Sequence, residues 1–170
     1  MKPILCILSL LLLAPGPAAG DSQQEPIPGL KIKVEQLYLN YHELAAVYAG
    51  MHDWANVVLD DDQELDYTQK VALFTNEAKM ICYYQWRLLS IVEYIRPDAL
   101  KDYFTLRLKD LARAKSDCEQ TVRLLSLYAG FVDQEGLQKS IAAAVVLIRG
   151  NIYIFDRLSE ILTGQTAASH

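Results

Sequence analysis

The residue types that carry most enzyme chemistry are sparse in this chain and lack catalytic spacing. Neither His42 nor His52 has a glutamate three positions earlier, as the Glu-x-x-His pairs of a di-iron bundle require. The haem-attachment sequence C-x-x-C-H and the nucleophile sequence G-x-S-x-G are absent. We therefore expect a protein that is not an enzyme and that holds no cofactor. The least favoured alternative is a bundle that binds a metal, or one that binds haem through one of the histidines together with Met51 or Met80.

An acidic run at residues 60–66 has the alternating carboxylates of a calcium loop. Asp60, Asp62 and Glu64 fit its first positions, but Leu65 stands where the loop needs glycine and Val71 where it needs glutamate. We interpret the run as a solvated turn whose charge favours the positive end of the next helix.

Two cysteines, Cys82 and Cys118, remain after the first twenty residues. Their spacing fits neither a zinc site nor a redox C-x-x-C motif. In an oxidising compartment they form either one structural disulfide or two buried thiols. Counted from the turn between their helices they differ in height by about six residues, or about 9 Å, so a bond requires the third helix to begin packing near Lys101.

Two amides interrupt otherwise apolar helix seams, Gln85 in the second helix and Asn151 in the fourth. Each lies about 18 or 19 residues above the start of its helix, and the two helices run in the same direction. The same level in the first helix falls near residues 39–41, where Tyr41 offers a hydroxyl. We expect Gln85, Asn151 and Tyr41 to form one polar layer, which either fixes the helix register or is the polar end of a ligand pocket.

The chain has ten tyrosines and two tryptophans. Many of them lie on or beside the seams of the first two helices: Tyr38, Tyr41, Tyr48, Tyr83, Tyr84, Trp86 and Tyr94. Core and boundary packing is the common use of such spacing, and an aromatic-lined cavity for an apolar ligand is the alternative.

Apolar residues recur at alternating steps of three and four along four long stretches, which predicts four helices. The first covers about 30–58, and the second begins with the capping pair Asp66 and Gln69 and ends at Arg96-Pro97. The third runs from Asp98 to about 129, and the fourth from Asp133 to 163–164. The expected seams include Phe74, Ile81 and Leu88 in the second helix, Leu108 and Val122 in the third, and Leu137, Ile141, Ala144, Ile148, Asn151, Phe155, Leu158 and Leu162 in the fourth. The fold class is an all-α, antiparallel up-down-up-down bundle of four long helices following a cleaved signal peptide.

The first twenty residues have the organisation of a secretory signal peptide. Lys2 precedes an apolar run at 4–13, which is too short to span a bilayer, and small residues at 18–20 offer a cleavage site. The expected organisation is a signal peptide at 1–20, a flexible leader at 21–29, the bundle at 30–164 and a disordered tail at 165–170. We expect an exported protein, periplasmic or extracellular, with no transmembrane span in the mature chain.

Charge argues against nucleic acid as a partner. Removing residues 1–20 takes away Lys2 and leaves 15 Lys+Arg against 21 Asp+Glu, a net charge of −6. The basic residues of the third helix, Arg107, Lys109, Arg113 and Lys115, alternate with acidic ones, which is typical of a solvated helix face.

Residues 141–148 of the fourth helix are apolar on every side, so this helix is either central or carries a second apolar face. We expect that face, formed by Ala142, Val145 and Val146, to mediate self-association or to bind a protein partner. The sequence thus favours a non-enzymatic helical module for binding or protein interaction. The alternative is a bundle that binds a small ligand at its polar layer.

Overall fold

The computed structural model describes residue 27 and residues 29–56 and 62–168, without the side chains of 55, 56, 62 and 168. Within this part of the chain all regular structure is helical. The long helices are α1 (Leu30–Asn56), α2 (Asp62–Ser90), α3 (Leu100–Tyr128) and α4 (Glu135–Ala168). Short 3-10 turns join them: η1 (Val92–Tyr94), η2 (Pro97–Ala99) and η3 (Ala129–Phe131). The predicted signal peptide and most of the leader lie outside the described residues.

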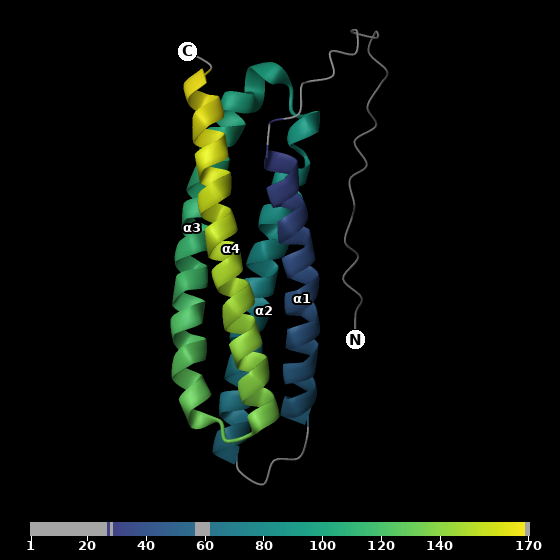
Figure 1. Cartoon of the computed structure of the whole chain (residues 1–170), viewed down its shortest axis with the longest axis vertical. Helices are drawn as coiled ribbons and strands as arrows, with labels where there is room; N and C mark the ends of the chain where they lie inside the picture. The colour runs from purple at the N-terminus through teal and green to yellow at the C-terminus, as the bar shows by residue number, and fades with distance from the viewer. Residues whose placement is uncertain (1–26, 28, 57–61, 169–170) are drawn as a thin grey trace, which may run out of the picture.

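The four long helices lie side by side along the long axis of the molecule (Figure 1). Each packs on the next in sequence, and α4 packs back on α1. Contacts between α1 and α4 run from Gly29 beside Ile161, through the Asn40–Asn151 hydrogen bond, to Gly136 beside Trp54. The helices α1 and α4 are therefore antiparallel. No described helix has an apolar stretch long enough to cross a membrane.

The predicted seam of α4 is confirmed in full, because all eight of its residues are buried. The seam of α2 is rotated from the prediction. Its buried positions are Thr68, Val71, Ala72, Thr75, Ala78, Cys82, Gln85 and Leu89, whereas Phe74, Ile81 and Leu88 are half-buried. Small side chains at 75, 78 and 82 suit the extensive packing of α2 on α1, since helices approach most closely where side chains are small.

Buried threonines satisfy their hydroxyls within their own helices. Thr68 donates to the Glu64 carbonyl, Thr75 to Val71 and Thr121 to Asp117, each four residues back. Threonine therefore occupies the interior of this bundle without an unpaired donor. Periodicity among apolar residues alone misses these positions, because it counts threonine as polar.

Several predicted helix ends differ from the structure. Asp66 does not cap α2, which begins at Asp62, and instead pairs with Lys70 one turn on at 2.5 Å. Asp98 does not cap α3, whose N-cap is Ala99 and makes no side-chain bond. The helix α4 continues to Ala168, past the predicted end at Gly164. The helix α2 thus begins earlier and α4 ends later than the local sequence signals indicate, whereas α3 begins at Leu100, after Asp98.

Candidate functional site

Asn151 on α4, which was predicted to belong to a buried polar layer, is hydrogen-bonded to a residue of α1. Asn151 is fully buried, and its Oδ1 accepts a hydrogen bond from Nδ2 of Asn40 on α1 at 2.6 Å. The first helix therefore contributes Asn40 to this layer. Tyr41, the residue expected there, is half-buried and packs against Tyr83 and His42 at the α1–α2 boundary.

Gln85 is buried, with 7% of its surface exposed, but its Oε1 accepts no hydrogen bond. The Nδ2 group of Asn151 is also without a hydrogen-bond acceptor. One unpaired acceptor and one unpaired donor thus lie on α2 and α4, helices that touch across the bundle. The hydrogen bonding of these buried amides is therefore incomplete, and each unpaired group lowers the stability of the fold.

The two cysteines flank this layer as free, buried thiols. Cys82 donates to the Leu37 carbonyl of α1 at 3.0 Å. Burial and, to a lesser extent, the nearby Cys118 thiol raise the pKa of Cys82 to about 12, while the Asn151 amide acts in the opposite direction. Burial, followed by Asp117 and Glu119, raises the pKa of Cys118 to about 12 as well. A disulfide between them stays a prediction.

The burial of Arg107 on α3 also differs from the prediction. It was expected on a solvated face, yet only 6% of it is exposed. One guanidinium nitrogen pairs with Asp110 at 2.8 Å and the group lies over the Tyr103 ring, but Nε and Nη1 have no hydrogen-bond partner. Its spacing from Phe104 and Leu111, three and four residues, was the signal that could have revealed this seam position.

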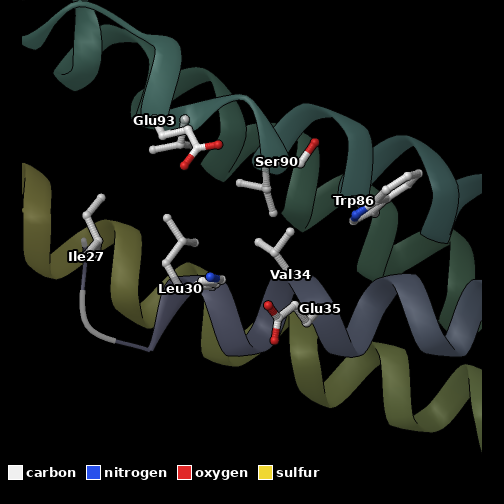
Figure 2. A pocket seen from close by; sticks show the side chains of 10 residues that line it. Ile27, Leu30, Val34, Glu35, Trp86, Ser90 and Glu93 are labelled. Atoms are coloured by element: carbon white, nitrogen blue, oxygen red, sulfur yellow. The ribbon is translucent and has the colours of Figure 1, made fainter. Parts of the chain in front are cut away.

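A groove of about 330 Å³ opens between the start of α1 and the end of α2. Figure 2 shows Leu30 and Val34 directed from α1 towards the opposite wall, which is lined by Trp86 and Ser90 of α2 and by Glu93 of η1. Leu89 and Val92 complete the apolar lining. This volume falls within the range of small-molecule and side-chain binding pockets.

Local backbone geometry explains why the groove has an end wall. Gly29 has a φ of 79°, a conformation that side chains with a Cβ rarely adopt, and it comes directly before α1. The Leu30 amide then bonds to the Ile27 carbonyl at 3.1 Å. This turn places Ile27 in the groove lining instead of on an extension of the helix.

Aromatic rings continue from the groove along the α1–α2 boundary. Trp86 is 4.8 Å from Tyr38 and 5.7 Å from Tyr83, measured between ring centroids, and Tyr83 is 5.3 Å from Tyr41. The Arg87 guanidinium lies 5.7 Å from the Trp86 ring. We call Tyr38, Tyr41, Tyr83 and Trp86 the aromatic strip. The rings of the aromatic strip pack on one another and are also partly accessible, because Tyr38 is exposed and the other three are half-buried.

The predicted partner face on α4 is only partly open. Val146 is 69% exposed and Ala142 is exposed, but Val145 is half-buried and packs against the core. His42 and His52 are exposed, as expected of surface histidines. Among the described residues, no group of three or more His, Cys, Asp or Glu side chains is placed to hold a metal ion.

Comparison with protein-family models, with curated proteins and with solved structures finds no match to this chain.

Proposed function

We propose that this protein is an exported, non-enzymatic bundle of up-down-up-down topology that binds apolar groups of a partner in the groove between α1 and α2. The groove itself carries the proposal. It combines an apolar lining from two helices with a tryptophan at one end and charged side chains at its rim. Such sites use apolar area for affinity and a few polar groups for orientation.

The chemistry of the other candidate sites supports binding over catalysis. The polar layer places amides and two thiols of high pKa in the core, away from the groove lining. A thiol with a pKa of about 12 is a poor nucleophile at neutral pH, because the thiolate is the reactive form. The groove is lined by two carboxylates, a lysine and a serine, without a histidine.

A neutral apolar fluorophore, N-phenyl-1-naphthylamine, tests the groove in the purified protein. We expect its emission to rise on binding and Ile27→Glu to weaken binding by about tenfold or more, since a carboxylate in the lining must be desolvated. Ile32→Glu is the matched control, because Ile32 is exposed on α1 and does not line the groove. Equal loss with both variants, or no binding by the parent protein, would exclude the groove as a site.

Export is tested separately by sequencing the N-terminus of the protein recovered outside the cytoplasm. Cleavage after Gly20 predicts Asp21 as the first residue. An intact Met1 on the recovered protein would contradict the signal peptide without affecting the groove.

Partner binding through α4 is the second candidate, favoured by the exposure of Val146. Self-association through this face predicts a mass that rises with protein concentration and that Val146→Glu lowers to the monomer. A monomeric parent protein at all concentrations would refute self-association at this face.

A further inference from the structure

We propose that the occupant of the groove is an amphipathic helix of a partner protein, with aliphatic anchors on one face and lysine or arginine beside them. This inference rests on the proposed function of the groove and names the chemistry of its partner. Three observations carry it: the spacing of the side chains on the groove walls, the charges at the rim, and the aromatic strip that continues one wall.

Each wall of the groove combines helical residues with a residue from the turn next to the helix. The α1 wall runs from Ile27 through Leu30 to Val34, and the opposite wall runs from Trp86 through Leu89 to Glu93. Within the helices, Leu30 and Val34 on one wall and Trp86 and Leu89 on the other are each about one turn apart, or about 5–6 Å at the rise of an α-helix. A helix lying in this groove would present side chains at positions i and i+4 to the apolar lining.

The rim of the groove favours a basic partner. Of its three charged lining residues two are carboxylates, Glu35 on the α1 side and Glu93 on the opposite side, and the third is Lys31 (Figure 2). Glu35 and Lys31 appear in none of the ion pairs formed among the described residues. The carboxylates on the two sides of the groove can each pair with a lysine or arginine next to the apolar anchors. Two such ion pairs would fix the orientation of the bound helix.

The aromatic strip extends the contact beyond the groove. Trp86 belongs to both, and Tyr38 and Tyr83 lie beside it with Arg87 over its ring. Tryptophan, tyrosine and arginine are the residues that most often dominate binding energy at protein interfaces. A single-chain amphiphile would fill the groove but leave this strip uncovered, whereas a helix of several turns covers both.

Two labelled peptides of about 18 residues test the proposal by fluorescence anisotropy. Both carry leucine on one helix face, and the other face is lysine in one peptide and glutamate in its counterpart. We expect the Leu/Lys peptide to bind and to displace N-phenyl-1-naphthylamine, and the Leu/Glu peptide to bind about tenfold more weakly or worse.

Charge-reversal variants distinguish a specific effect of the rim carboxylates on peptide binding from the effect of the net negative charge of the chain. Glu35→Lys and Glu93→Lys should each weaken the Leu/Lys peptide several-fold and strengthen the Leu/Glu peptide. Glu43→Lys makes the same charge change on α1 at an exposed position outside the groove lining, and should alter neither affinity by more than about twofold. Equal effects of all three variants would overturn the proposal, because binding would then follow net charge alone.

The outcomes distinguish this inference from the groove itself. Suppose that the fluorophore binds and that Ile27→Glu abolishes its binding, but that the Leu/Lys peptide does not displace it. The groove is then confirmed as a binding site, and the proposal of a helical partner is wrong. If the fluorophore is displaced by raising the protein concentration, with a dimer that Ile27→Glu dissociates, the occupant is a second copy of this chain. If neither fluorophore nor peptide binds, both proposals fail.

Discussion

Asn40 on α1 donates a hydrogen bond to Asn151 on α4 at 2.6 Å, joining residues 111 positions apart in the chain. The acceptor is fully buried, and Asn40 is half-buried with its amide beside Gly150. A bond between two amides in the interior of a bundle sets the height of one helix against the other. Sliding α1 along α4 by one turn would separate the pair and leave the Asn151 amide with neither of its groups bonded.

We expect the two asparagines to be coupled in stability. Asn40→Leu should cost about 1–3 kcal/mol, because it leaves the Asn151 oxygen buried without a donor, and Asn151→Leu should cost less. The double variant should be more stable than the sum of the single effects implies. A denaturant double-mutant cycle measures the coupling, and strictly additive effects would show that the bond contributes nothing.

Gln85→Met should be neutral or stabilising by about 1 kcal/mol, since the Gln85 oxygen already lacks a donor and methionine has a similar shape. This outcome differs from that of a satisfied layer, in which the same substitution would be costly. Urea denaturation of the two proteins decides between them. A loss above about 2 kcal/mol would mean that the Gln85 amide makes interactions as strong as a paired amide.

The two thiols predict a loss of stability at alkaline pH. Their pKa is about 12 in the folded protein and near 9 when unfolded, so between these values the unfolded chain binds fewer protons. Stability should fall as pH rises through this window, by up to about 1.4 kcal/mol per pH unit for each thiol. The Cys82→Ala/Cys118→Ala variant should show a shallower decline than the parent protein.

Thiol labelling at pH 8 provides an independent measurement of the same pair. Free thiols should react with iodoacetamide slowly in the native protein and rapidly in denaturant without reductant. Denatured protein that reacts only after reduction would instead establish the disulfide.

Glycine positions on α1 and α4 predict opposite effects of the same substitution. An added Cβ at Gly136 would lie 2.7 Å from the Trp54 ring, whereas at Gly50 nothing lies within 4 Å. Gly136→Ala should therefore destabilise by about 1–3 kcal/mol, and Gly50→Ala should stabilise by up to about 1 kcal/mol. Thermal unfolding compares the two variants, and a stabilised Gly136→Ala would show that Trp54 moves without cost.

Arg107→Met should be neutral or stabilising despite the loss of an ion pair. Burial of a guanidinium with two unpaired nitrogens is unfavourable, and methionine fills similar space beside Tyr103. Asp110→Ala should be destabilising, because it leaves the buried charge of Arg107 without its carboxylate. Equal destabilisation by both variants would mean that the pair is net favourable for the fold.

The all-helical architecture was predictable from the sequence because its strongest signals are local. The seam of α4 follows a strict three-four period with large apolar residues at nearly every step. Only one face of this helix can therefore be the buried face. Gln85 and Asn151 were recognised as buried because each replaces an apolar residue in such a period. The exposure of His42 and His52 was predictable because the sequence around them has no metal-ligand or catalytic spacing.

Only the tertiary structure decided which faces of α2 and α3 are buried and which side chains meet. On these helices the large apolar residues Phe74, Ile81 and Leu108 are only half-buried. Smaller threonine, alanine and cysteine side chains are buried instead, because neighbouring helices pack closely there. Arg107 is buried on the inward face of α3 as well. Asn40 joins Asn151 in place of Tyr41 because one residue of helix rotation, about 100°, separates their directions. The groove depends on the relative ends of two helices and the turn at Gly29, a relation between distant segments that no local period encodes.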